Sequence, residues 1–377
     1  MMKRNKKWWY FFVFAFFIIY IFAAARPVPK ETVIVPRWIT SVEMNYPVRL
    51  EGFSGENEEP RLLPFILGNR FGYVGDDGRF AITQTRNAYF SMSEKHWAEF
   101  EAYPSYVRVM NPQNETVFVI EDIDGFPLFL DGRVYIMGSE QNSITALGPA
   151  GEKLWTHVFP AKITDFDAAA GFVLAGTLDG AVVLLNPSGN LVFPPFEPGG
   201  SRLLAIYGCA ISRDASRIAI ISGIDSQRFL LLERSGDTHR VIHHEFLGEG
   251  FRRRVHVSFV NNDRKVVFER EGGLGIFDIS SRRTVNINLE GEIVALDNYG
   301  GGDFLFVITS HGPGQKRLIT IRYPEGNFRT LGPRRRAPGI IVNEAPFSSD
   351  AAFFARRGNR LFLGGDSTMI SFEMEKR

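Results

Sequence analysis

The sequence DGRVYIMGSEQNSITALGPAGEKLWTHVF (residues 131–159) and the stretch that follows it, AGFVLAGTLDGAVVLLNPSGNLVF (residues 170–193), decide the fold. Both contain short runs of Val, Ile, Leu, Phe and Tyr, which are typical of strands and too short for buried helices. The runs are separated by Gly beside Asp, Asn or Ser, residues that tolerate positive φ and support tight hairpins. Each stretch is therefore predicted to be a series of antiparallel strands.

The same hairpin recurs along the chain, with turn centres near residues 77, 140, 178, 225, 272, 313 and 366. Most steps are about 40–50 residues, the period of a four-stranded propeller blade. Strands such as AVVLL and RFLLLE are apolar on both faces, so each sheet needs neighbours that a ring provides, whereas a β-sandwich predicts alternation and irregular spacing. We expect an all-β protein, a single β-propeller over residues 39–377 with seven blades, or eight as the alternative.

Two segments depart from the repeat. The longest step, between residues 77 and 140, is predicted to hold an insertion near residues 89–112 with a short helix over residues 91–101. Residues 39–50 are predicted to supply the outer strand that closes the last blade against the first, because a ring closed in this way has no exposed edge.

The two quoted stretches resemble the propellers built from PQQ-like or WD-like repeats. They are similar to that family's order of an apolar strand, a Gly-x-x-Asp-Gly turn, a second strand and a turn of a small residue and Gly. The second stretch has the first of these turns as GTLDG (residues 176–180), and in the first stretch Trp155 stands at the family's tryptophan position. The resemblance implies architecture and not function. It invites one enzymatic interpretation, a quinone-cofactor dehydrogenase, but many such enzymes use a vicinal cysteine pair. Because Cys209 is the sole cysteine, we expect no such cofactor.

The N-terminus predicts a membrane anchor. A basic tail (residues 1–7) precedes WWYFFVFAFFIIYIFAAA (residues 8–25), an uncharged run of eighteen residues, which is roughly 27 Å long as a helix and matches the bilayer core. Lys and Arg favour the cytoplasmic side, so the rest of the chain is predicted to lie outside the inner membrane, periplasmic or extracellular. Residues 26–38, with three prolines, are predicted to be a stalk. Cleavage after Ala25 is the alternative.

Few residues suggest chemistry. The chain carries 43 Lys and Arg against 42 Asp and Glu, which gives no argument for a nucleic-acid partner. EDIDG (residues 121–125) has the start of a calcium loop but lacks the remaining ligands, so a plain turn is favoured. His243 and His244 would point to opposite faces of a strand. We expect no catalytic, cofactor-binding or metal-binding residue, and a buried, inert Cys209.

Arginine clusters and displaced aromatic residues are the candidates for partner binding. Arginine offers paired donors to carboxylates and phosphates, and aromatic residues outside the repeat could form an exposed ledge. The competing interpretations are solvated loops for the arginines and packing over a blade for the aromatics. The candidates are Arg252, Arg253, Arg254, Arg334, Arg335, Arg336, Trp97 and Tyr103.

These features favour a non-catalytic, membrane-anchored scaffold that binds envelope proteins. Its layout resembles the propeller subunit of the outer-membrane barrel-assembly machinery, with an uncleaved helix as the anchor. The alternative is a propeller enzyme or ligand-binding protein that holds a carbohydrate or quinone cofactor at the channel mouth. Paired carboxylates there, about 5–10 Å apart, would favour glycoside chemistry.

Overall fold

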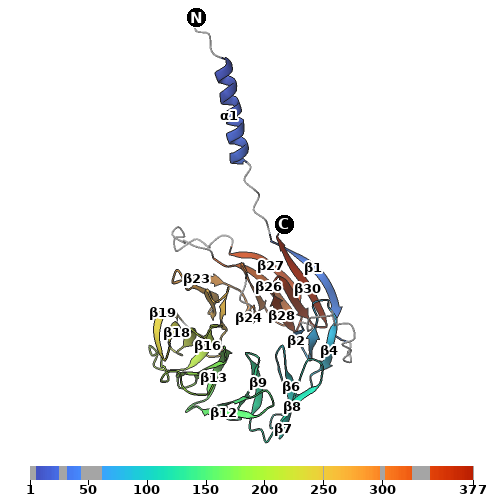
Figure 1. The fold of residues 1–377 in the computed structure, drawn as a ribbon, viewed down its shortest axis with the longest axis vertical. Helices are drawn as coiled ribbons and strands as arrows, with labels where there is room; N and C mark the ends of the chain where they lie inside the picture. The colour runs from blue at the N-terminus through green and yellow to red at the C-terminus, as the bar shows by residue number, and fades with distance from the viewer. Residues whose placement is uncertain are drawn as a thin grey trace.

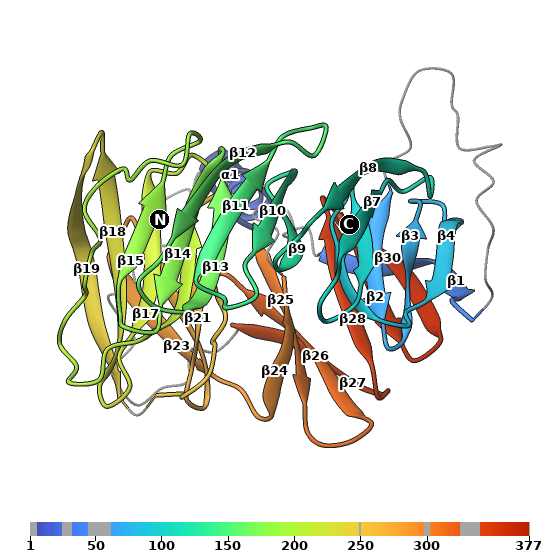
Figure 2. The same ribbon diagram turned by 90° about the horizontal axis from the view of Figure 1, so that it is seen from below.

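The computed structural model describes residues 6–24, 32–43, 62–248, 250–297, 302–324 and 340–376. Within these ranges, helix α1 (Lys6–Ala24) precedes thirty strands in eight antiparallel sheets. The sheets stand around a common centre as the blades of a propeller (Figure 1), and their strands cross the thickness of the ring in side view (Figure 2). The predicted all-β propeller is confirmed, and it has eight blades where seven were favoured.

Blades 1 to 8 follow the chain, and within each blade every strand pairs with the next. Blade 1 is β2 (Leu63–Leu67), β3 (Arg70–Val74) and β4 (Phe80–Thr85); blade 2 is β5 (Tyr89–Met92), β6 (Trp97–Phe100), β7 (Tyr106–Met110) and β8 (Thr116–Glu121); blade 3 is β9 (Phe126–Leu130), β10 (Arg133–Met137), β11 (Ser143–Leu147) and β12 (Lys153–Val158); blade 4 is β13 (Ile163–Ala169), β14 (Phe172–Thr177) and β15 (Val182–Leu185).

The second half of the ring repeats this order. Blade 5 is β16 (Ile206–Ile211), β17 (Arg217–Ser222), β18 (Gln227–Ser235) and β19 (Thr238–Gly248); blade 6 is β20 (Val257–Val260), β21 (Lys265–Arg270), β22 (Gly273–Asp278) and β23 (Arg283–Asn288); blade 7 is β24 (Glu292–Leu296), β25 (Phe304–Ser310), β26 (Gln315–Arg322) and β27 (Ile341–Ser348); blade 8 is β28 (Ala352–Arg357), β29 (Arg360–Gly365), β30 (Thr368–Lys376) and β1 (Thr32–Ser41).

The predicted insertion is in fact blade 2, which supplies the eighth unit. Residues 91–101, predicted to hold a helix, form most of the β5–β6 hairpin, in which Tyr89 pairs with Phe100. Its turn is closed by Ser93, whose backbone N–H donates to the His96 carbonyl at 2.7 Å and whose Oγ accepts the His96 N–H at 3.1 Å. The hairpin that recurs in the other blades joins the second and third strands, and in blade 2 this is the β6–β7 turn EAYPS (residues 101–105), which contains neither Gly nor Asp. The Gly-Asp signature therefore does not mark blade 2 as a repeat.

An N-terminal strand closes the ring as expected, but it lies earlier in the chain than predicted. Strand β1 pairs with β30 from Thr32 opposite Lys376 to Ser41 opposite Thr368. Residues 32–38, predicted to belong to the stalk, are therefore part of the propeller, and residues 44–50 lie outside the described ranges. Trp38 ties this strand to blade 1, because its indole N–H donates to the Asp76 carbonyl at 2.9 Å.

The core is a series of apolar layers between adjacent blades. Between blades 5 and 6, for example, the rings of Phe229 and Phe268 stack with centroids 4.4 Å apart, and both side chains are fully buried. This confirms that each sheet is apolar on both faces and is covered by its neighbours. A rigid ring of this kind presents its loops in fixed positions.

Helix α1 exposes its apolar side chains, among them Trp8, Phe12, Phe16 and Tyr20. Among the described residues, no helix combines the length and the hydropathy that a membrane crossing requires, so the predicted spanning helix is not confirmed.

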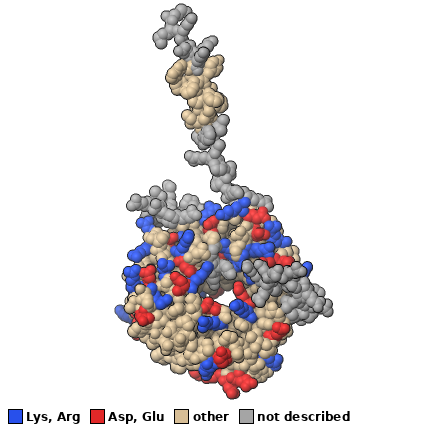
Figure 3. Space-filling model, viewed as in Figure 1, with Lys and Arg blue, Asp and Glu red and all other residues tan. Residues whose placement is uncertain are grey.

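On the propeller itself, the face in Figure 3 carries Lys and Arg interspersed with Asp and Glu over the upper blades. A broad area without charge lies over β12 and β13.

Candidate functional site

The two faces of the ring carry different loops. The connection face bears the chain passages from one blade to the next and the turns between second and third strands, such as β6–β7. The hairpin face bears the turns between first and second strands, such as β16–β17. Strand β1 begins on the hairpin face and ends on the connection face, as the pairing of Thr32 with Lys376 and of Ser41 with Thr368 shows.

A cavity of about 660 Å³ opens on the connection face between blades 2 and 3. Its walls come from the β6–β7 turn, the passage from β8 to β9, and the ends of β5 and β9. We call it the aromatic groove and define it by Tyr89, Phe100, Tyr103, Pro104, Phe126 and Pro127.

The floor of the aromatic groove is a row of nearly parallel rings. Tyr89 and Phe100 stack with centroids 6.3 Å apart and planes 18° apart, and Phe100 and Phe126 stack at 6.4 Å and 7°. Phe100 thus joins β6 of blade 2 to β9 of blade 3. Tyr103 stands beside the row with 88% of its surface exposed, so water meets a large aromatic surface here.

The charges on the rim of the aromatic groove are acidic. Glu101 and Asp124 are exposed and line it, whereas no Lys or Arg does among the residues that the structure describes. Asp124 belongs to the 121–125 segment, which forms the turn from β8 to β9. Gly125 has φ 139°, and a Cβ there would lie 2.0 Å from the Met137 carbonyl oxygen. Glycine is therefore required where the chain enters β9 and runs close to the end of β10 in blade 3.

The two aromatic candidates from the sequence have different roles. Tyr103 lies in the aromatic groove, as the predicted ledge requires. Trp97 does not, since only 6% of it is exposed, its ring packs 5.1 Å from that of Phe71, and its N–H donates to the Asn111 carbonyl at 3.0 Å. The packing alternative therefore holds for Trp97.

The first arginine cluster lies between β19 and β20, and two of its members pair with buried acids. Arg253 holds the buried Glu269 through two hydrogen bonds of 2.6 and 3.2 Å. Arg254 Nε lies 2.6 Å from Oδ1 of Asp165, which is also buried. Arg252 is exposed. The second cluster, Arg334, Arg335 and Arg336, lies outside the described residues.

A second cavity, of about 840 Å³, is lined by the first strands of blades 4, 5 and 6. Sequence reasoning missed its two carboxylates, although the alternating acids of ITDFDAA on β13 were a signal. Asp165 accepts the Cys209 N–H at 2.7 Å and Asp167 accepts the Ile211 N–H at 2.9 Å. Because β16 pairs only with β17, these N–H groups lie on an edge without a strand partner. The carboxylates therefore join blade 4 to blade 5.

This second cavity has two neighbouring carboxylates, as the alternative of glycoside chemistry requires, but both already bind neighbouring groups of the protein. Each carboxylate binds a backbone N–H, and Asp165 also pairs with Arg254. Burial raises the pKa of Asp165 and brings that of Asp167 to about 6. Cys209 is buried and its thiol pKa is raised by that burial, as expected of an inert thiol. Over the described ranges, no group of three or more His, Cys, Asp or Glu side chains could hold a metal ion.

Asp167→Asn is expected to gain stability relative to wild type as the pH rises to neutral. Its one oxygen keeps the acceptor for the Ile211 N–H, while its NH2 group replaces the Oδ1 that accepts the Ala168 N–H at 2.8 Å. The folded pKa of about 6 lies above the usual 3.8, so the folded state binds the proton more tightly, and the wild-type protein loses stability as pH rises from about 4 to 6. Urea unfolding should show the variant gaining about 2 kcal/mol relative to wild type between pH 4 and 7. A difference independent of pH would contradict the prediction.

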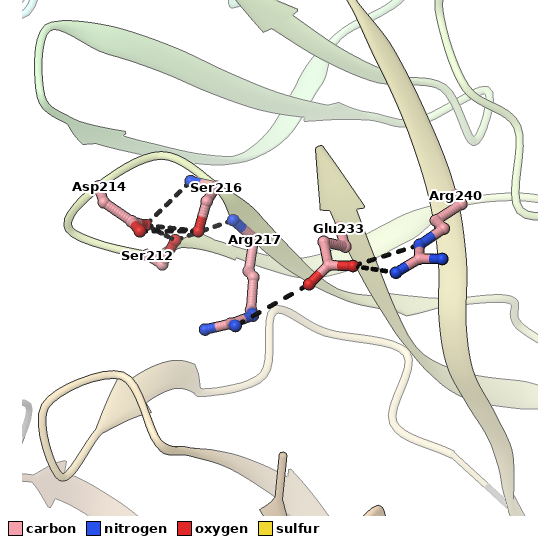
Figure 4. A network of polar contacts seen from close by, with 6 residues as sticks. All are labelled: Ser212, Asp214, Ser216, Arg217, Glu233 and Arg240. Carbon is pink, nitrogen blue, oxygen red and sulfur yellow. Dashed lines mark hydrogen bonds and ion pairs between the residues drawn. The ribbon is translucent and has the colours of Figure 1, made fainter. Parts of the chain in front are cut away.

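A third cavity, of about 750 Å³, lies on the hairpin face between blades 5, 6 and 7 and has charged walls. Figure 4 shows its edge, where Glu233 lies between Arg217 at 3.9 Å and Arg240 at 2.5 Å. In the adjoining β16–β17 turn, Ser212 and Ser216 donate hydrogen bonds to Asp214. Although burial opposes the shift, these bonds lower the pKa of Asp214 to about 2. At this edge Glu233 is thus paired with two arginines, and Asp214 is satisfied by the hydroxyl groups of its own turn.

Eight blades of this kind, closed by an N-terminal strand, define a β-propeller. The chain belongs to the beta-propeller protein family, whose family model matches residues 1–377. An uncharacterized protein of Treponema pallidum (strain Nichols) is 28% identical over 299 residues, which are 78% of this chain and 78% of that protein.

Solved structures share the architecture. BamB from Moraxella catarrhalis superposes with a TM-score of 0.58 at 12% identity, over 90% of this chain and all of that one. Sqt1 from Saccharomyces cerevisiae superposes with a TM-score of 0.56 at 12% identity, over 81% of this chain and 90% of that one. At these identities the likeness shows the fold alone.

Proposed function

We propose that this protein is a non-catalytic scaffold of the cell envelope that binds other proteins through the aromatic groove. The observation that carries the proposal is the row of parallel rings at Tyr89, Phe100 and Phe126 with the exposed Tyr103 beside it. Aromatic residues are enriched in the buried centres of protein interfaces and carry much of their binding energy. The carboxylates of the 840 Å³ cavity, by contrast, already hold blades 4 and 5 together.

The geometry of the aromatic groove suits binding without rearrangement. Two blades fix its rings, since Phe100 is on β6 and Phe126 on β9, and Gly125 lets the chain run close to β10 just before Phe126. A partner that covers Tyr103 would remove a large apolar surface from water and order few side chains, because Tyr has only two rotatable side-chain torsions. A preorganised site of this kind binds more tightly than a mobile one of equal area.

Attachment to the inner membrane through the N-terminal apolar segment is part of the proposal. The exposed apolar side chains of α1 support it, together with the basic residues that precede them in the sequence. The register of β1 adds a further argument, because Thr32, the first residue of this strand, lies on the hairpin face. The aromatic groove opens on the opposite face, so a membrane attachment before Thr32 leaves the groove accessible to a partner.

Photo-cross-linking in intact cells tests this function. A photoreactive phenylalanine analogue in place of Tyr103 should capture one or a few defined envelope proteins, in complexes that are recovered with the membrane fraction. The matched control is the same analogue at Phe246 on β19, an aromatic residue that is 61% exposed but lies outside the aromatic groove. Equal capture from both positions, or none from position 103, would refute the proposed role, and complexes released by osmotic shock without detergent would refute the attachment.

A further inference from the structure

We propose that the aromatic groove binds an extended, basic, proline-containing segment of its partner. This inference rests on the proposed function and specifies the chemistry of the partner. Three properties of the aromatic groove carry it: the spacing of its rings, the free hydroxyl groups beside them and the sign of the charge on its rim.

The spacing of the rings suits a polyproline II segment. Consecutive centroids are 6.3 and 6.4 Å apart, so the three rings span at most about 13 Å, the length of roughly four residues at 3.1 Å per residue. Parallel aromatic rings with Pro104 and Pro127 beside them form the kind of surface on which proline rings dock. The segment enters this groove already extended, so binding orders it at little entropic cost.

A partner peptide cannot bind in the aromatic groove by adding a strand to a sheet. The walls of the aromatic groove come from turns and strand ends, and β5, β6 and β7 of blade 2 already pair in sequence. A peptide bound here must therefore be held by its side chains and by hydrogen bonds to its own carbonyl groups. A polyproline II segment leaves those carbonyls free, because it has no internal hydrogen bonds.

Two tyrosine hydroxyl groups are placed to donate to such carbonyls. Tyr89 and Tyr103 are 63% and 88% exposed, and in the part of the chain that the structure describes neither hydroxyl has a hydrogen-bond partner. A tyrosine can stack through its ring while its O–H donates to a backbone carbonyl. This arrangement suits a ligand with both apolar rings and unpaired acceptors.

The charge on the rim selects a basic segment. Glu101 and Asp124 are exposed on the rim, with Glu121 and Asp122 exposed nearby on the same turn as Asp124. Neither Glu101 nor Asp124 forms an ion pair within the described ranges. Lys or Arg residues flanking the prolines would pair with these carboxylates, whereas an acidic segment would be repelled.

The test measures binding of a fluorescein-labelled peptide, Arg-Pro-Leu-Pro-Arg-Pro, to the full-length protein by fluorescence anisotropy. We expect saturable binding that weakens as NaCl is raised. Replacing the prolines by alanine, or the arginines by glutamate, should each weaken binding at least about 10-fold. Failure of the parent peptide to bind, or equal binding of all three peptides, would overturn the inference.

Variants of the protein assign the contact to the aromatic groove. Tyr103→Ala should weaken binding at least about 10-fold, Tyr103→Phe about 3-fold through loss of the hydroxyl donor, and Glu101→Lys with Asp124→Lys about 10-fold. Phe246→Ala on β19 is the control and should bind as wild type. Unchanged binding by Tyr103→Ala would place the peptide elsewhere and refute the inference.

The two proposals can fail separately. Specific capture at position 103 without peptide binding leaves the scaffold function standing and refutes the partner chemistry. Peptide binding that depends on Tyr103, combined with no capture in cells, supports the chemistry of the aromatic groove and refutes the envelope-scaffold role.

Discussion

Arg356→Met is expected to lower the free energy of unfolding by about 3–5 kcal/mol, because it removes the cation from a buried ion pair. Arg356 lies on β28 of blade 8. Its guanidinium Nη1 is 3.2 Å from Oδ2 of Asp297 and 2.9 Å from the Phe304 carbonyl oxygen. Asp297 directly follows β24 of blade 7, and Phe304 is the first residue of β25 in the same blade. Arg356 and Asp297 are both almost fully buried. The variant keeps the Asp297 carboxylate in the apolar layer between two blades and removes the guanidinium that lies 3.2 Å from it.

Chemical unfolding followed by circular dichroism measures the effect, and two further variants establish its cause. Arg356→Met combined with Asp297→Leu should recover most of the loss, because it removes both charges. Arg79→Met breaks the exposed pair with Asp77, whose atoms are 3.4 Å apart, and should cost less than about 1 kcal/mol. A loss below about 1 kcal/mol for Arg356→Met would show that this pair does not hold blades 7 and 8 together.

The fold could be predicted from the sequence wherever the same Gly-Asp hairpin turn recurs. Gly-Asp hairpins revealed seven units, and the apolar faces of their strands required a closed ring. In the eighth unit the corresponding turn, between β6 and β7, reads EAYPS (residues 101–105) and contains neither Gly nor Asp. The closing strand was expected on physical grounds, but the three prolines before residue 38 suggested a stalk. Pro36 lies at the irregular register of an outer strand, where proline is tolerated.

The candidate site was predictable only in part, because its members come together from separate blades. Tyr103 was identified because it lies outside the Gly-Asp repeat, yet the same reasoning misplaced Trp97, which belongs to the blade. Nothing in the local sequence distinguishes Phe126, because its stacking on Phe100 depends on how blades 2 and 3 pack together. Arg253 and Arg254 looked free, because their acidic partners are fixed by blade packing and not by local sequence.

Deletion of residues 1–41 is expected to lower the free energy of unfolding by at least about 4 kcal/mol, and it should be compared with a deletion of residues 1–31. The longer deletion removes β1, which leaves β30 without its outer partner and opens blade 8, where strands distant in sequence close the ring. It also removes Trp38, whose ring packs 5.9 Å from that of Phe362. Trp38 is half-buried, so its loss alone contributes part of the roughly 3–5 kcal/mol that removal of a fully buried tryptophan costs.

The shorter deletion retains every hydrogen bond between β1 and β30 and should unfold at the temperature of the full chain. Strand β1 also contributes Arg37, which pairs with Glu373 and Glu375 at 2.7 Å, so the longer deletion leaves two acids on an unpaired edge. Such an edge is a template for association with another chain, and the longer deletion should form oligomers in light scattering. If both deletions unfold alike, closure by β1 does not stabilise the propeller, and its blades are held by their apolar layers alone.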